Sequence, residues 1–270
     1  MTNAILRGKP YAGNPHVRFD EGEVASEKPR RGSLLYNMTI RMMIVGVAVL
    51  ALAGCASLPC SDENGFARIF NGKDLDGWAG RKDLFLVENG ELVFKEGPRN
   101  FGNLFYDREF TNFVARFSFK LVPNGNNGFA IRAGRPCFDG GALVGGNELL
   151  RDAAYNGMEI QVLDNTGDKK QHLKAWQYHG SIYGVVAAQR DCLRPVGEWN
   201  DEEVVANGED ITVKVNGKVI LSTSVKDLDT NGGTPDGKKH PGLHNFSGYI
   251  GFLGHTMPVR FRDIRVKELR

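Results

Sequence analysis

Alternating apolar and polar positions run through the chain from Phe66 to its C-terminal end, and this spacing predicts β-strands. The clearest example is FVARFSFKL at 113–121, where every second residue is apolar. Asn-Gly pairs at 89–90 and 216–217 stand between apolar runs and predict two tight hairpins. We find no apolar spacing of helical period in residues 66–270. The pattern therefore predicts an all-β fold, a single sandwich of antiparallel strands.

The stretch YNGMEIQVLD at 155–164 is a predicted strand with two different faces. Met158, Ile160 and Val162 fall on one face, and Gly157, Glu159 and Gln161 fall on the other, because side chains alternate along a strand. The polar face could line a groove, or it could simply face water as in many antiparallel sheets. Glycine-rich segments at 135–154 and 230–245 are expected to be long loops, and 181–186 a short strand.

The N-terminal part of the chain does not follow the strand pattern. Residues 1–37 are polar and aperiodic, and we expect them to be disordered or to precede the true start at Met38. Residues 38–54 combine a basic flank, a short apolar run and small residues, which is typical of a secretory signal. The LAGC sequence ending at Cys55 resembles the lipobox of bacterial lipoproteins, which implies cleavage before Cys55, lipidation of its thiol and a tether over residues 55–65. We therefore expect a periplasmic or outer-membrane lipoprotein of a bacterial cell envelope, held at the membrane by its lipid anchor alone.

Charge and cysteines add two expectations. Residues beyond 54 keep 27 of the 34 Lys/Arg and 28 of the 32 Asp/Glu, so the mature part is nearly neutral and has no basic footprint for nucleic acid. Cys137 and Cys192 both lie in Pro/Gly-rich loop sequence, and an exported protein meets an oxidising compartment, so we predict that they form a disulfide and leave Cys60 free.

Several short motifs follow one another along the chain. They are FNGKDLDGW, FVARFSFKL followed by NGFAIRA, YNGMEIQVLD, GEW, KVNGKVI and GYIGFLGH with VRFRDIRVKEL. Together they resemble the bacterial 3-keto-disaccharide hydrolase domain, over about residues 66–269. The resemblance implies a concanavalin A-like jelly roll of two curved antiparallel sheets with a carbohydrate-sized groove. It also implies cleavage of the glycosidic bond in sugars, oligosaccharides or glycosides, that carry a ketone at C3.

A C3 ketone acidifies the C2 proton, so a base can remove it and the C1 substituent can then leave. Such a site needs a base, a donor for the enolate oxygen and an acid for the leaving group. We predict Glu159 as the base, Arg132 for the developing negative charge and His255 as the acid, with Gln161 orienting sugar hydroxyls. Arg132 and Glu159 could instead be a simple cross-strand ion pair, and His255 a loop residue without a role.

Aromatic and acidic loop residues complete the candidate set. Trp176, His179 and Trp199 are candidates for contacts with sugar rings, although Trp199 could equally belong to the core. No cofactor is required by the sequence, but Asp164 and Asp168 could supply oxygen ligands for calcium or another divalent cation.

Two alternative functions remain open. Glu159, Gln161 and Asp164 echo the E-x-D-x-x-E strand of jelly-roll glucanases, which need two carboxylates across the scissile bond. Here the middle acid is an amide, and Glu159 and Asp164 would point to opposite faces of a regular strand. A lectin-like surface module without catalysis is the second alternative, because the fold alone does not decide function.

Overall fold

The computed structural model describes residues 59, 61–96, 101–134, 138–139, 142–143, 152–167, 172–231 and 233–270. The predicted leader at 1–37, the signal at 38–54 and the lipid site Cys55 lie outside the described residues. In the part of the chain that is described, no helix is long and apolar enough to cross a membrane.

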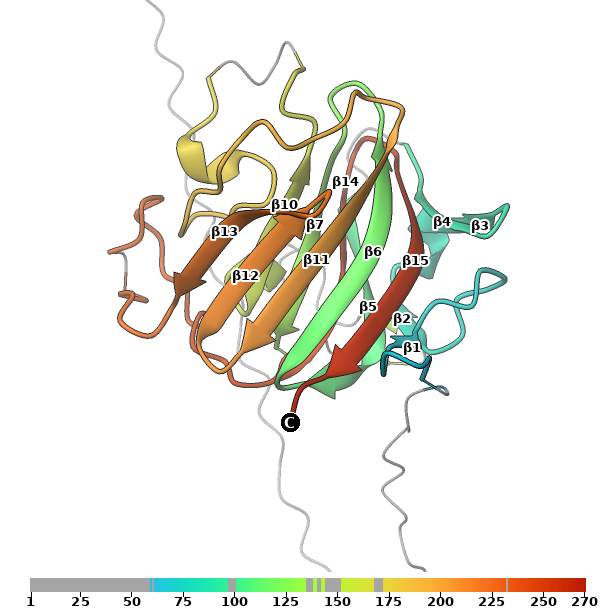
Figure 1. The fold of residues 1–270 in the computed structure, drawn as a ribbon, viewed down its shortest axis with the longest axis horizontal. Coiled ribbons are helices and arrows are strands. Elements are labelled where there is room, and N and C mark those ends of the chain that lie inside the picture. The colour runs from blue at the N-terminus through green and yellow to red at the C-terminus, as the bar shows by residue number, and fades with distance from the viewer. Residues whose placement is uncertain are drawn as a thin grey trace, which may run out of the picture. The chain divides into compact units, whose positions relative to one another are not determined.

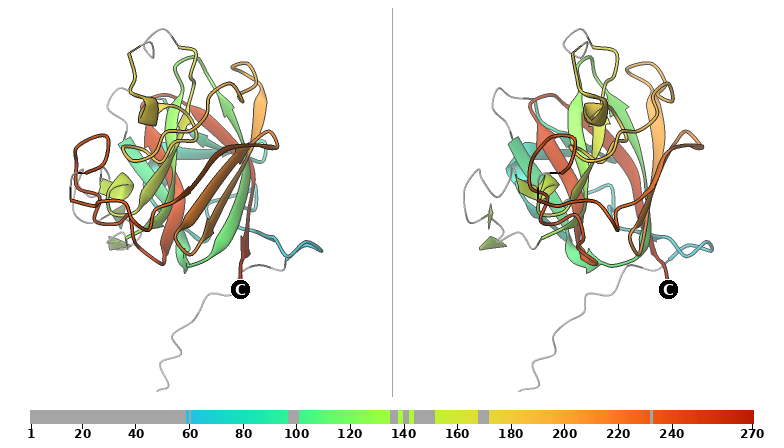
Figure 2. Two further views of the ribbon diagram at one scale, coloured as in Figure 1. Left: turned by 60° about the vertical axis from the view of Figure 1, so that its left-hand side comes forward. Right: turned by 90° about the vertical axis from the view of Figure 1, so that its left-hand side faces the viewer.

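Antiparallel strands form two main sheets, which confirms the predicted all-β sandwich. Figure 1 looks onto the larger sheet, with the smaller sheet behind it, and Figure 2 turns the two layers to the side. The larger sheet has the order β13-β12-β11-β6-β15-β4-β3, and β1 pairs with β15. Its strands are β1 (Ala67–Arg68), β3 (Phe85–Glu88), β4 (Glu91–Phe94), β6 (Phe113–Leu121), β11 (Trp199–Asn207), β12 (Asp210–Val215), β13 (Lys218–Ser224) and β15 (Val259–Glu268).

The smaller sheet has five strands in the order β10-β7-β14-β5-β2. They are β10 (Met158–Leu163), β7 (Asn126–Ala133), β14 (Gly248–His255), β5 (Phe101–Phe110) and β2 (Trp78–Gly80). The short strands β8 (Phe138–Asp139) and β9 (Ala142–Leu143) pair with each other. Single turns of 3₁₀ helix lie at η1 (Lys82–Leu84), η2 (Asp152–Ala154) and η4 (Ala175–Gln177).

The core lies between the two sheets and is filled largely by phenylalanine. Phe117 of β6 packs edge-on against Phe252 of β14, with ring centroids 5.5 Å apart, and Phe252 packs against Phe261 of β15 at 4.0 Å. In β6 the predicted inward residues, from Phe113 to Leu121, are all buried. Alternation along each strand thus sends one set of side chains into the core and leaves the other set for the outer faces.

Both predicted hairpins are confirmed. Asn89 and Gly90 join β3 to β4, and Asn216 and Gly217 join β12 to β13, with positive φ at all four residues as this turn requires. The strand predicted at 181–186 is wrong: these residues form turns, and Ile182 makes only isolated bridges to Ile160 and Val186.

Candidate functional site

A polar pocket of about 370 Å³ opens on the outer face of the smaller sheet. Its floor follows one cross-strand row in which Gln161 of β10 pairs with Gly128 of β7, and Gly128 pairs with Leu253 of β14. The centre of the floor is low because Gly128 has no side chain. The lining side chains and backbone come from Asn103, Asn126, Ala154, Tyr155, Glu159, Gln161, Tyr183, Lys238, Leu253, Gly254 and His255.

Glu159 stands on this floor, on the polar face predicted for its strand. Its carboxylate leans over Gly128, where an added Cβ would collide with Oε1. On the other side, the Glu159 carbonyl accepts the backbone N–H of Tyr183 at 2.9 Å. Desolvation raises the pKa of Glu159 to about 8, because the surrounding protein removes water from the carboxylate. The side chain is thus a carboxylate of unusually high proton affinity that faces a cavity.

Tyr155, Tyr183 and Lys238 form the wall beside Glu159. The Lys238 ammonium donates to Tyr155 Oη at 2.8 Å, and this hydrogen bond raises the pKa of Lys238. Burial raises the pKa of Tyr183, and the negative charge of Glu159 adds to that shift. Tyr183 Oη accepts a hydrogen bond from Gln177 at 3.4 Å. Two phenols and one ammonium therefore share the pocket with one carboxyl group.

Lys238 comes from the glycine-rich loop at 230–245, and Asp236 organises that part of the loop. Asp236 Oδ1 accepts from the Thr234 hydroxyl at 2.9 Å and from the backbone N–H of Lys238 at 2.9 Å, and it lies 3.1 Å from His240 Nε2. The neighbouring Gly184 has no room for a side chain, since a Cβ would lie 2.5 Å from Asp236 Oδ2. The sequence analysis missed Lys238, because nothing in the spacing DGKKH connects it to the strand that carries Glu159.

Gln161 and His255 also line the pocket, as predicted. Gln161 Nε2 donates to Asn126 Oδ1 at 3.0 Å, which fixes the orientation of both amides. His255 is exposed at the end of β14. The structure therefore brings Glu159, Gln161 and His255 to one cavity.

Arg132 does not line this pocket, and its predicted role there is not supported. The residue is buried, with φ of 49°, and its guanidinium points into the loops at one end of the sandwich. Nη1 donates to the carbonyls of Gly208 and Asn245 at 2.6 and 3.3 Å, and Nε and Nη2 donate to the Thr111 carbonyl at 3.2 and 2.9 Å. Nη2 also reaches Asn112 Oδ1 at 3.4 Å. All five N–H groups are used in holding loops together, so none is left for a substrate.

His179 lies in the core and not in the groove. Its Nδ1 accepts the backbone N–H of Leu163 at 3.3 Å, and its ring lies 5.0 Å from the ring of Phe119. Burial lowers the pKa of His179 to about 3. Trp176 is nearer to the pocket: it is part-buried and packs edge-on against Tyr183, with centroids 5.1 Å apart. Trp176 thus supports the pocket wall, and His179 has no access to a sugar in this structure.

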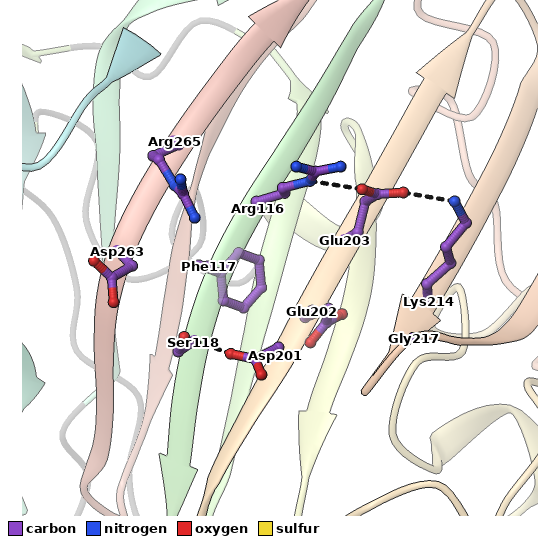
Figure 3. A pocket seen from close by; sticks show the side chains of 10 residues that line it. All are labelled: Arg116, Phe117, Ser118, Asp201, Glu202, Glu203, Lys214, Gly217, Asp263 and Arg265. Atoms are coloured by element: carbon purple, nitrogen blue, oxygen red, sulfur yellow. Dashed lines mark hydrogen bonds and ion pairs between the residues drawn. The ribbon is translucent and has the colours of Figure 1, made fainter. Parts of the chain in front are cut away.

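Trp199 lies on the opposite side of the molecule, on the outer face of the larger sheet. Its ring is covered by Lys120 and Arg262, at 4.7 and 4.0 Å from the centroid. A second hollow of about 390 Å³ lies on the same sheet (Figure 3). There Arg116 and Lys214 both donate to the carboxylate of Glu203, at 2.6 and 2.7 Å. These charges pair with one another, and Trp199 is separated from Glu159 by the whole sandwich.

The candidate metal ligands do not form a site among the described residues. Asp164 is buried at the end of β10, where Oδ2 accepts from Asn124 N–H at 2.8 Å and Oδ1 accepts from the N–H and hydroxyl of Thr166 at 2.8 and 2.7 Å. Asp168 lies outside the described residues, and the described residues contain no group of three or more His, Cys, Asp or Glu placed to hold a metal ion. Asp164 is therefore explained as a loop-fixing residue.

The predicted disulfide also involves an undescribed residue. Cys192 is part-buried and has no disulfide partner among the described residues, and Cys137 lies outside them. The pairing of Cys137 with Cys192 stays a prediction.

Comparison with known proteins gives a consistent result. A protein named 3-keto-disaccharide hydrolase from Bacteroides thetaiotaomicron is 26% identical over 234 residues, which cover 77% of this chain and 80% of that protein. A solved structure named "Putative glycosyl hydrolase" from Parabacteroides distasonis superimposes with a TM-score of 0.61 at 24% identity, covering 76% of this chain and 99% of the other. A Bacillus subtilis protein of unknown function with a galectin-like fold gives a TM-score of 0.52 at 14% identity, covering 75% and 94% of the two chains. The structural matches show the shared fold, and the family and the relative's name support an enzyme of the glycoside hydrolase type. Because the family model matches residues 65–267, the chain belongs to the 3-keto-alpha-glucoside-1,2-lyase-like domain family.

Proposed function

We propose that this protein cleaves glycosides or disaccharides that carry a ketone at C3, and that Glu159 removes the C2 proton. The observation that carries the proposal is the position of the part-buried Glu159 carboxylate over Gly128 in a polar pocket, where desolvation raises its pKa to about 8. A carbon acid next to a ketone gives up its proton reluctantly, and a base of higher proton affinity removes it faster. The family and the named relative support the substrate class.

The reaction proceeds through an enolate. Glu159 takes the C2 proton, and the electrons of that C–H bond form the C2=C3 double bond and place a negative charge on the C3 oxygen. When the ketone re-forms, the C1–O bond breaks and a C1=C2 double bond appears. Water then adds at C1, and Glu159 returns its proton to C2, so that the net change is hydrolysis.

The enolate oxygen needs donors near Glu159, and Arg132 cannot provide them. The backbone N–H of Tyr183 donates to the Glu159 carbonyl, and because Tyr183 Oη accepts from Gln177, its own proton is available to the pocket. The amides of Gln161 and Asn126, together with His255, line the remaining floor and suit sugar hydroxyls. We assign Tyr183 to the C3 oxygen and these polar groups to substrate binding.

A two-carboxylate mechanism fits this pocket less well. Glu159 is the one acidic residue among the described residues that line it. Asp164, the second acid of the glucanase-like spacing, is buried in its own loop contacts. Direct hydrolysis of an ordinary glycan needs a pair of carboxyl groups, about 5–10 Å apart.

The test is incubation with a 3-keto glucoside and with its unoxidised parent, each with and without chelator. We expect cleavage of the 3-keto compound alone. We expect the same rate with and without chelator, because Asp164 is held in loop contacts. Cleavage of the parent would contradict the proposal and favour a glucanase. Binding without cleavage of either compound would favour a lectin.

We also propose that the chain is exported and anchored at the cell envelope through lipid on Cys55. The support is the signal and lipobox sequence at residues 38–55. Metabolic labelling with a palmitate analogue should tag the protein in its bacterial host, and Cys55→Ala should remove the tag. Labelling that survives this substitution would refute the anchor.

A further inference from the structure

Lys238 and Tyr155 form a close pair at one end of the Glu159 pocket. Lys238 Nζ donates to Tyr155 Oη at 2.8 Å and also lies 5.1 Å from the centre of the tyrosine ring. Both residues line the pocket, and both act electrostatically on Tyr183, as Glu159 does. The pair is therefore within the same electrostatic environment as the proposed base.

The contact fixes which way the phenol donates. A phenol oxygen carries one proton, so a Tyr155 oxygen that accepts from an ammonium must direct its own proton elsewhere. The Lys238 ammonium, 2.8 Å from this oxygen, faces the negative charge that forms there when the proton leaves. An ammonium–phenol pair in a substrate pocket is thus suited to proton donation.

The position of this pair differs from that of His255, the acid predicted from the sequence. Glu159 and Gly251 share one cross-strand row through Ala130, and His255 lies four residues further along β14. Two strand spacings and four residues separate the Cα atoms of Glu159 and His255 by roughly 16 Å. The C2 proton and the glycosidic oxygen are attached to neighbouring carbons, so one base and one acid must act within a few ångströms of each other. Tyr155 belongs to the same chain segment as the base, four residues before Glu159, whereas His255 lies two strands away on β14.

We infer that Tyr155 is the acid that protonates the leaving oxygen, with Lys238 as its positioning residue. The inference rests on the proposed function. In this step the C1–O bond breaks, its electron pair goes to the leaving oxygen, and Tyr155 supplies the proton that makes an alcohol. The water that adds at C1 gives one proton to the Tyr155 phenolate. Glu159 then returns to C2 the proton that it removed in the first step.

Neighbouring residues hold Tyr155 and Lys238 in place through the tyrosine ring and the backbone. The ring of Tyr155 packs against His240, with centroids 4.9 Å apart, and the Gly242 N–H donates to the Tyr155 carbonyl at 2.8 Å. Asp236 binds the backbone of Lys238. A Tyr155→Phe variant retains the ring and its packing and loses only the hydroxyl.

Two substrates with different leaving groups test the acid. Methyl 3-keto-glucoside needs protonation of the departing methoxide, whereas the 4-nitrophenyl compound releases a stable phenolate unaided. We expect Tyr155→Phe to lower kcat/KM at least about 100-fold on the methyl compound and less than about 10-fold on the nitrophenyl compound. Lys238→Met should show the same selectivity in weaker form, and Lys238→Arg should restore part of the activity.

A third compound separates this inference from the role of Glu159. A 3-keto C-glucoside cannot lose its C1 substituent, so exchange of its C2 proton in D₂O reports the base alone. We expect Tyr155→Phe to keep this exchange, and Tyr183→Phe, the matched control, to slow exchange and both cleavage reactions equally. The inference would be overturned if Tyr155→Phe lost equal activity on both substrates, or if it lost the exchange reaction. It would also be overturned if His255→Gln, and not Tyr155→Phe, lost more activity on the methyl compound than on the nitrophenyl compound. Absence of exchange in the unmodified protein would refute Glu159 as base, while the leaving-group comparison still judges Tyr155.

Discussion

Glu159 and Glu202 are two strand carboxyl groups with similar electrostatics and different surroundings. Burial raises the pKa of both, to about 8 for Glu159 and well above the usual range for Glu202. Glu159 faces a pocket with phenols, amides and an ammonium. The side chain of Glu202 is sealed between the sheets, with its Oε2 3.7 Å from Nε2 of His179 and neither oxygen hydrogen-bonded.

The comparison shows that a raised pKa identifies desolvation and not function. A catalytic carboxyl group needs a path for the substrate. The part-buried side chain of Glu159 lines a pocket. Glu202 borders the hollow on the larger sheet, but its side chain is fully buried. Glu202 and His179 are instead a polar defect in the core, whose effect should appear in stability.

The largest expected difference between the two residues is in catalysis. Glu159→Gln should lower kcat/KM on a 3-keto glucoside at least about 100-fold, because the base is lost while the shape is kept. Glu202→Gln should stay within about threefold of the unmodified enzyme. The rate of the unmodified enzyme should rise with pH through about 8 as Glu159 ionises. A pH–rate profile for each protein checks this, and equal losses in the two variants would erase the distinction.

A smaller loss is expected when the floor of the pocket is altered. Gly128→Ala places a Cβ against the Glu159 carboxylate, so it should displace the base and reduce kcat/KM about 10-fold or more. Gly134→Ala is the matched control, since its Cβ would meet nothing closer than 3.5 Å. If both variants keep full activity, the position of Glu159 over Gly128 does not matter for the reaction.

The core pair should shape the dependence of stability on pH. Unfolding frees Glu202 to ionise, so its contribution to the free energy of unfolding falls as pH rises above about 4.5. Unfolding also frees His179 to protonate, so its contribution falls as pH drops below about 6.5. Between pH 4.5 and 6.5 the two contributions change in opposite directions. The free energy of unfolding should therefore be nearly constant in this range and fall at both lower and higher pH.

Glu202→Gln should remove only the alkaline loss. We expect it to raise the free energy of unfolding at pH 8 by about 1–3 kcal/mol and to leave the acid side unchanged. Urea titrations at pH 4, 6 and 8 measure this. An unchanged slope between pH 6 and 8 would show that Glu202 is not the group responsible.

The smallest effect is expected on the opposite face. Trp199→Ala removes the ring that Lys120 and Arg262 cover and leaves the Glu159 pocket unchanged. We therefore expect kcat/KM to change less than about twofold. Loss of substrate binding in this variant would reinstate the sugar contact predicted from the sequence. Steady-state kinetics with a 3-keto disaccharide provide the measurement.

The sequence predicts this fold well where one face of a strand is buried and the other is not. Alternation located β6 and both Asn-Gly hairpins, and it placed Glu159 and Gln161 on the face that carries the pocket. Strand β5 escaped notice because Leu104 and Phe105 are both buried, one in the main core and one in a small cluster on the outer face, so its alternation is lost.

The errors in the site have physical causes. Arg132 follows the alternation of β7, but its positive φ near the strand end turns the side chain into the loops. His179 and Lys238 lie outside regular strands, where no period relates a residue to a face. Loop hydrogen bonds of high sequence separation decide such positions, and a single sequence does not display them.

Asp236 has a consequence for the entropy of binding. By anchoring Thr234, Lys238 and His240 before any substrate arrives, it orders the backbone that carries Lys238 during folding. The Lys238 ammonium is therefore already positioned when a substrate binds, and little binding free energy is spent on ordering that segment. Substrate range can accordingly change through exchange of the 230–245 loop, while the sheet that carries Glu159 stays as it is.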